Sequence, residues 1–218
     1  MGNLEPGHQT ALELRKLVPE ALTGGGSFAL MLPHPGTLAA EDRASVFESA
    51  QKAAVAQCLK ALLARAGLPE DTRVMSGDGG QRIWPPGFVG SLTHKGTVVL
   101  GVIAGSEKVP MIGLDLERLD RTLSEIEEMV APEGLPPGLD VERGRLMAFS
   151  AKEAVFKAQY PVTHEILDFS DVRLVWERGE GDVMIARALC PVAGLSVRAI
   201  FVDEWVITVA LSVRNPAP

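Results

Sequence analysis

Apolar side chains in the first half of the chain recur with both helical and strand spacing. Residues 42–66 repeat apolar positions every three or four residues and end at a Gly-Leu-Pro sequence, which predicts a long helix. Before it, three glycines at 24–26 lead into the apolar run SFALMLP and predict a flexible turn, because no nucleotide-loop spacing surrounds them. The turn-rich stretch 76–90 precedes THKGTVVLGVIAG and PMIGLDLE, which are typical of strands.

The second half presents the same kinds of element. Residues 123–130 predict a short helix, and the Pro- and Gly-rich stretch 132–138 predicts a break. A helix follows that reaches about Gln159, although Ser150 and Glu153 also fit a capping box that would start it at Ser150. Four alternating runs then predict antiparallel strands: VRLVWERG, GDVMIARALC, LSVRAIFVD and EWVITVALSV. TVVLGVIA and WVITVALS are alike in pattern, which allows an internal structural repeat.

Composition indicates a globular protein of ordinary polarity. The 218 residues are 46% hydrophobic and 22% charged, enough for one large domain or two small ones. The net charge of −7 argues against sequence-independent binding to nucleic acid or to an anionic membrane. No apolar run has the length of a membrane span, and the first residues lack a secretory signal. Cys58 and Cys190 sit among apolar residues as expected of buried free thiols, so we expect a cytoplasmic protein.

Two carboxylates stand two residues apart in the segment GLDLE at 113–117. On a strand, Asp115 and Glu117 point to one face while the intervening leucines point to the other. An amphipathic strand with a solvated acidic face explains this pattern. A metal site explains it too, since neighbouring like charges repel without a counter-charge and Mg²⁺ prefers carboxylate and phosphate oxygens.

A second charged cluster interrupts an apolar segment, FSAKEAVFKA at 149–158. On a helix Glu153 and Lys157 share a face, while Lys152 lies about 100° further round. The pattern fits either a helical ion pair, worth roughly 0.2–0.5 kcal/mol, or a site that uses an acid and cations to hold a metal and phosphates. Upstream, GSLTH ends at His94, which fits a structural histidine or a hydrogen-bond donor to a phosphate.

Taken together and in this order, these segments resemble the 4′-phosphopantetheinyl transferases of the surfactin type, in the branch of enterobactin synthase component D. The resemblance frames roughly residues 76–175 and rests on four segments: WPPGFVGSLTHKG (84–96), IGLDLE (112–117), FSAKEAVFKAQYP (149–161) and LDFSDVRL (167–174). It implies a holo-[acyl-carrier-protein] synthase. Such an enzyme moves the 4′-phosphopantetheine arm of coenzyme A (CoA) to a serine of an apo acyl or peptidyl carrier protein and releases 3′,5′-ADP. These carriers serve fatty acid, polyketide, siderophore or non-ribosomal peptide biosynthesis.

The resemblance also implies a fold of the α+β class. We expect two similar α/β halves with antiparallel sheets, related by a pseudo-twofold axis, with CoA in the cleft between them. The N-terminal half, 1–117, would hold the nucleotide side of CoA and the first metal carboxylates. The C-terminal half, 118–218, would hold the helix with the Lys-Glu-Ala motif and the last sheet. The two would form one compact monomer.

Site roles follow from the same resemblance. Three carboxylates would hold Mg²⁺ or Mn²⁺: Asp115, Glu117 and Glu153. Four side chains would contact the pyrophosphate of CoA or lie beside it: Lys152, Lys157, His94 and Thr93. Glu153, directly or through a metal-bound water, would help to deprotonate the carrier serine. The expected catalytic residues are Glu153, Lys157 and Asp115.

The helix at 42–66 departs from the family pattern. Family members carry several arginines there that grip the 3′-phosphate of CoA, whereas this chain has three scattered cations: Lys52, Lys60 and Arg65. In the segment before the tryptophan, Gly77 and Asp78 keep the pattern, but Arg82 replaces a proline. We therefore expect a rearranged 3′-phosphate pocket in which Arg43, Lys52 or Arg82 replaces these arginines. Gly77 and Asp78 are further candidates for CoA binding.

Two alternatives use the same residues. One is a catalytically weak homologue that binds CoA or a carrier protein without transfer, which the missing arginines leave open. The other is a metal-dependent hydrolase of the CoA pyrophosphate, with water as the nucleophile and no need for a carrier. For the transferase, we expect the carrier to dock through apolar contacts and local cations, with Phe156, Tyr160 and residues 118–135 contributing by family analogy.

Overall fold

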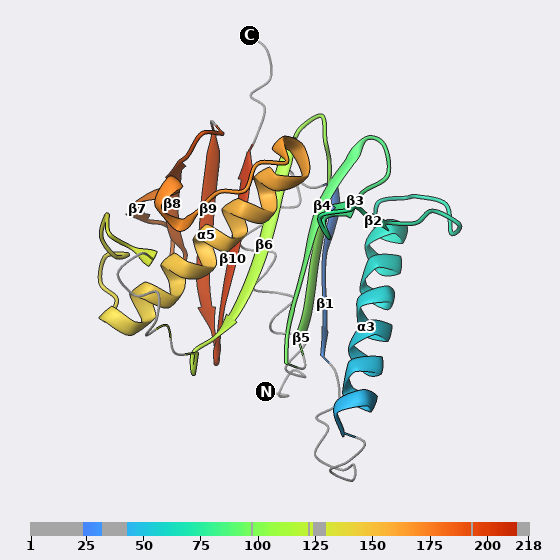
Figure 1. The fold of residues 1–218 in the computed structure, drawn as a ribbon, viewed down its shortest axis with the longest axis horizontal. Helices are drawn as coiled ribbons and strands as arrows, with labels where there is room; N and C mark the ends of the chain where they lie inside the picture. The colour runs from blue at the N-terminus through green and yellow to red at the C-terminus, as the bar shows by residue number, and fades with distance from the viewer. Residues whose placement is uncertain are drawn as a thin grey trace.

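The fold has two main antiparallel sheets, and a long helix packs against each of them (Figure 1). The computed structural model describes residues 24–31, 43–96, 98–121, 123, 130–192 and 194–212. The first sheet has the strand order β1 (Gly24–Met31), β5 (Val98–Gly105), β4 (Phe88–Lys95). The second has the order β6 (Met111–Arg118), β10 (Trp205–Ser212), β9 (Leu195–Val202), β8 (Met184–Leu189), β7 (Arg173–Arg178). A two-stranded hairpin, β2 (Met75–Ser76) and β3 (Arg82–Ile83), precedes β4.

The helix predicted at 42–66 is confirmed as α3 (Arg43–Arg65), which packs on β1 and β5. Ala54, Cys58 and Leu62 are spaced by four residues and are at most 2% exposed, so they form one buried stripe. A flexible turn was expected at the three glycines 24–26. That prediction is wrong, because these glycines are part of β1. The register against β5 shifts between Gly24 and Ser27, and glycine tolerates such an irregularity in a paired strand.

The second long helix, α5 (Val141–Thr163), packs against β6, β10 and β9. Its N-cap is Asp140, whose side chain accepts a hydrogen bond from the backbone N–H of Arg143 at 2.9 Å. The alternative start at Ser150 is therefore wrong, since Ser150 lies fully buried inside the helix. The helix runs past Gln159 and ends at His164, which adopts the left-handed conformation with φ 59°. None of the described helices is both long and apolar enough to cross a membrane.

The four strands predicted in the last third are confirmed as β7 to β10, and all neighbours in their sheet are antiparallel. The two runs of similar pattern, TVVLGVIA and WVITVALS, fall on β5 and β10, whose side chains are almost all buried. An antiparallel α+β fold is thus observed, while the pseudo-twofold relation of the halves stays a prediction. The short helix predicted at 123–130 lies outside the described residues except at its two ends.

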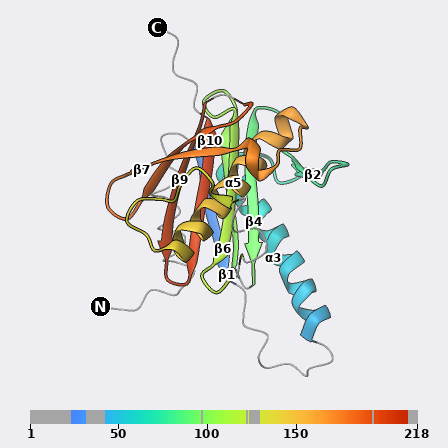
Figure 2. The same cartoon turned by 60° about the vertical axis from the view of Figure 1, so that its left-hand side comes forward.

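The chain passes from the first sheet to the second between Gly105 and Met111. Strand β6 pairs with β10 along its whole length, from Trp205↔Arg118 to Ser212↔Met111, so it belongs to the second sheet. The division of the chain into two halves after residue 117 stays a prediction. Figures 1 and 2 both show β6 beside β4, at the facing edges of the two sheets. A side-chain bond joins these edges, because the Leu114 N–H donates to Ser91 Oγ at 2.9 Å.

Candidate active site

The candidate site starts from strand β6, where Asp115 and Glu117 point to the same face. Their exposed fractions are 3% and 5%, so both carboxylates are taken out of bulk water. Leu114 and Leu116 point to the other face and join the core between the sheets. The predicted alternation is confirmed, but the acidic face is not solvated. Buried carboxylates need a compensating charge or hydrogen bonds, so the amphipathic-strand explanation does not hold.

Helix α5 covers the acidic face. Gly113, also on this face, lies so close to the helix that a Cβ atom there would meet the backbone oxygen of Ala154 and come 2.5 Å from the backbone nitrogen of Ala158. The close approach brings Glu153 and Lys157 of α5 to the acids of β6. Lys157 Nζ donates to Asp115 Oδ1 at 2.6 Å.

Glu153 is half-buried on α5 and is electrostatically coupled to both acids of β6. Burial is the largest cause that raises the pKa of Glu153 above its ordinary value, and Asp115 is the next. Glu117 raises this pKa further, while Lys157 and Arg121 oppose the shift. The three predicted carboxylates therefore share one electrostatic environment.

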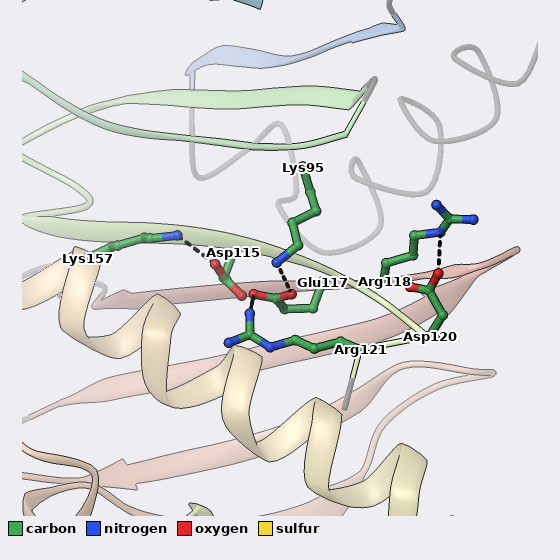
Figure 3. Close-up of polar contacts among 7 residues, drawn as sticks. All are labelled: Lys95, Asp115, Glu117, Arg118, Asp120, Arg121 and Lys157. Carbon is green, nitrogen blue, oxygen red and sulfur yellow. Dashed lines mark hydrogen bonds and ion pairs between the residues drawn. The ribbon is translucent and has the colours of Figure 1, made fainter. Parts of the chain in front are cut away.

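Two cations that the sequence analysis missed hold Glu117 (Figure 3). Lys95 Nζ, from the end of β4, lies 2.7 Å from Glu117 Oε2. Arg121 Nη1 donates to Glu117 Oε1 at 2.5 Å, and its guanidinium lies 4.1 Å from the centre of the Phe149 ring on α5. The alternation of a strand predicts that Lys95 lies on the same side of β4 as Thr93. Its contact with Glu117 could not be predicted in this way, because it depends on β4 lying beside β6.

A cavity of about 470 Å³ opens beside Lys157. One part of its lining carries the positive charges of Arg82 and Lys157, with His94 beside them. Another part is apolar and includes Phe156 and Tyr160, whose rings stack with centres 5.3 Å apart. Partial burial of the His94 ring is the main cause that lowers its pKa, and the nearby positive charges of Lys157 and Arg82 lower it further.

Comparison with known proteins identifies the family to which this arrangement belongs. A model of the 4′-phosphopantetheinyl transferase N-terminal domain matches residues 53–104. The 4′-phosphopantetheinyl transferase Svp of Streptomyces mobaraensis is 33% identical over 183 residues, which cover 76% of this chain and 72% of Svp. This chain belongs to the 4′-phosphopantetheinyl transferase family. The predicted resemblance is thereby confirmed.

Other members of the family are similar over shorter stretches. The 4′-phosphopantetheinyl transferase PptT of Mycobacterium tuberculosis is 32% identical over 131 residues, 56% of each chain. Enterobactin synthase component D of Salmonella typhimurium is 32% identical over 95 residues, 38% of this chain and 36% of that protein. The chain thus spans about half the length of some curated relatives that it matches.

Lys152, which the family resemblance assigned to the pyrophosphate, has other partners here. Its side chain is 2% exposed, pairs with Glu133 at 3.2 Å and donates to the Phe169 carbonyl at 2.9 Å. Glu133 Oε1 also accepts the Leu174 N–H at 3.0 Å. Burial lowers the pKa of Lys152, and Glu133 opposes that shift. The structure does not bring Lys152 to the three carboxylates. Lys152 instead connects α5 to Glu133 in the loop before the helix, and Glu133 in turn contacts the start of β7.

The remaining residues expected to bind CoA are dispersed. Thr93 is buried on β4 at 6% exposure. Gly77 closes the turn between β2 and β3 through a bond to the Gln81 carbonyl at 2.8 Å, and Asp78 beside it is exposed. Lys52 lies on the exposed side of α3 in an ion pair with Glu48 at 2.7 Å. Of this group only Arg82 lines the cavity beside His94.

The donor set of the acidic face fits a hard divalent cation such as Mg²⁺ or Mn²⁺. Asp115 Oδ2 is buried and accepts no hydrogen bond from the part of the chain that the structure describes. Glu117 Oε2 lies near Lys95 Nζ, but the contact lacks hydrogen-bond geometry and counts only as an ion pair. Within the described residues, no three His, Cys, Asp or Glu side chains are arranged so that they could hold a metal ion. Metal binding would therefore require the cations around these acids to change partners.

Proposed function

We propose that this chain transfers the 4′-phosphopantetheine arm of CoA to the serine hydroxyl of an apo acyl or peptidyl carrier protein and releases 3′,5′-ADP. The observation that carries the proposal is the pair of buried carboxylates, Asp115 and Glu117, which face Glu153 and Lys157. Lys157 also lines a cavity that contains a further cation and two aromatic rings. Family membership supports the same reaction.

The lining of the cavity suits the two ends of the transferred group. Phosphoryl transfer depends mainly on positioning and on neutralising the charge of the phosphates. Lys157, with a 31% exposed side chain, and Arg82 would contact the pyrophosphate or the 3′-phosphate. His94, which its lowered pKa keeps neutral at neutral pH, would donate an N–H to a phosphate oxygen. Phe156 and Tyr160 would receive the less polar pantetheine arm.

Glu153 is the candidate general base. The serine oxygen forms a new bond to phosphorus while the bond from phosphorus to the 3′,5′-ADP oxygen breaks, and Glu153 takes the hydroxyl proton. A carboxylate in this place can accept the hydroxyl proton, which a serine must lose to become an effective nucleophile. Asp115, Glu117 and Glu153 would hold Mg²⁺ or Mn²⁺, which when bound polarises the phosphoryl group and neutralises charge.

We also propose that the enzyme is monomeric and cytoplasmic, and that CoA binds between the two halves of the chain.

The test is intact-mass spectrometry of a panel of apo carrier proteins after incubation with the chain, CoA and Mg²⁺. We expect one carrier or more to gain the mass of one phosphopantetheine arm, and EDTA to abolish the gain. Unchanged carriers with intact CoA would indicate a protein that only binds. Cleaved CoA with unchanged carriers would indicate a hydrolase. Either result would refute the proposal.

A further inference from the structure

Cations already neutralise the acids that would hold the metal. Lys157 pairs with Asp115, and both Lys95 and Arg121 pair with Glu117. Glu153 adds the third acid, so three negative charges stand against three positive ones. The acids are buried, with side chains 5% and 7% exposed for Asp115 and Glu117. The cations reach in from the rim and are 31% to 39% exposed.

The cations come from separate elements that converge on the acids (Figure 3). Lys95 ends β4 in the first sheet, Arg121 follows β6, and Lys157 lies on α5. A divalent ion that bound alone would displace all three from their acids. It would leave a site with two excess positive charges and three cations without a counter-ion, which Coulomb repulsion disfavours in a partly buried place. A pyrophosphate supplies the missing negative charge.

We propose that Lys95 and Arg121 couple metal binding to CoA binding through an exchange of partners. Asp115, Glu117 and Glu153 would hold the metal, and the released Lys95 and Arg121 side chains would then contact the pyrophosphate. The inference rests on the proposed function and extends it to two residues to which the family resemblance assigns no part in metal or CoA binding. Since coupling between two ligands is reciprocal, the metal strengthens CoA binding by the same factor by which CoA strengthens metal binding.

Titration of Mn²⁺, followed by the electron paramagnetic resonance signal of the free ion, tests this coupling without turnover. Wild-type protein is titrated with and without CoA and with no carrier present, and a protein-free titration corrects for Mn²⁺ bound by CoA in solution. We expect CoA to tighten Mn²⁺ binding by about tenfold or more, because it supplies the missing counter-charge. Equal Mn²⁺ affinity with and without CoA would overturn the inference.

Two variants test the residues themselves. Arg121→Gln and Lys95→Gln each remove one cation, so each should tighten Mn²⁺ binding in the absence of CoA by about tenfold and reduce the effect of CoA. Arg118→Gln is the matched control, because Arg118 pairs with Asp120 and Glu204 at the end of β6 and touches neither acid (Figure 3). Thermal melting establishes that each variant is folded.

The two proposals fail in different ways. If Arg121→Gln and Lys95→Gln bind Mn²⁺ as the wild type does, these contacts are structural ion pairs and the inference is wrong. If the carriers gain the arm while Mn²⁺ affinity is independent of CoA, the transferase stands and only the coupling falls. If the wild type neither binds Mn²⁺ in the presence of CoA nor modifies any carrier, both proposals fall.

Discussion

Gly113→Ala should displace the two elements that carry the acids. An alanine Cβ would lie 2.5 Å from Ala158 N and 3.0 Å from the carbonyl carbon of Ala154, whereas ordinary contacts are 3.4 Å or longer. Both neighbours are helix backbone, which cannot rotate away as a side chain can. Helix α5 must therefore move from β6 by about 1 Å, since a packed interior has no room to absorb the methyl group.

The size of the effect follows from this displacement. Overpacking of a core costs about 1–3 kcal/mol, and backbone contacts place this variant at about 3 kcal/mol or more. For a chain of this length that corresponds to a fall in Tm of roughly 6–12 °C. Glu153 would move relative to Asp115 and Glu117, and a 1 Å misplacement of catalytic groups costs about 100-fold in rate.

The assay compares Gly113→Ala with Gly105→Ala at the end of β5. A Cβ at Gly105 would meet nothing within 4 Å, and its backbone is not in the left-handed region. Urea unfolding and the rate of carrier modification are measured for both variants. We expect Gly105→Ala to unfold within about 1 kcal/mol of the wild type and to keep its rate. If the two variants behave alike, the close packing of α5 on β6 does not position the site, and the reasoning is refuted.

Three further results are expected from residues around the site. Lys152→Met should cost about 3–5 kcal/mol in urea unfolding, because it leaves Glu133 buried without its partner, and Glu133→Gln should recover part of the loss in the double variant; additive losses would contradict the pairing. The pKa of His94, followed by NMR, should lie below 6.5 and should rise in Lys157→Gln. Between the lowered pKa and 6.5, the folded protein binds fewer protons than the unfolded chain. His94 therefore lowers the free energy of unfolding as the pH falls through that window. Burial raises the pKa of Cys58 to about 12, so a thiol reagent at about pH 8 should modify Cys58 only after unfolding; fast modification of Cys58 in a folded Cys190→Ser variant, which lacks the other free thiol, would contradict this.

Local periodicity explains what could be predicted about the fold. The helix of α3 and the four C-terminal strands follow from the spacing of apolar residues. The shared face of Asp115 and Glu117 follows from the alternation of a strand. These features depend on neighbours in sequence, whereas the pairing of β6 with β10 joins segments about 90 residues apart and has no local signature. The sheet to which β6 belongs could not be predicted for this reason.

The candidate site shows the same division. The acids and Lys157 could be predicted because the motif spacing already places them on a strand and a helix. Lys95 and Arg121 could not, since each meets Glu117 only through the packing of β4, β6 and α5. The family motif also led to the prediction that Lys152 contacts the phosphates. Lys152 is instead buried against Glu133, which lies in a loop 19 residues away in the sequence, so this contact has no local signal.

The most direct test of the central claim is the rate of carrier modification in Asp115→Asn, measured by intact mass, beside Asp182→Asn. Asp182 is exposed in the turn between β7 and β8, at the side of the sheet away from β6, so it controls for loss of an aspartate charge. We predict that Asp115→Asn loses about 100-fold or more of the rate while remaining folded, because the metal that would neutralise the phosphate charge loses a ligand. The Asp182→Asn variant should modify carriers as the wild type does. A wild-type rate in folded Asp115→Asn would contradict the account.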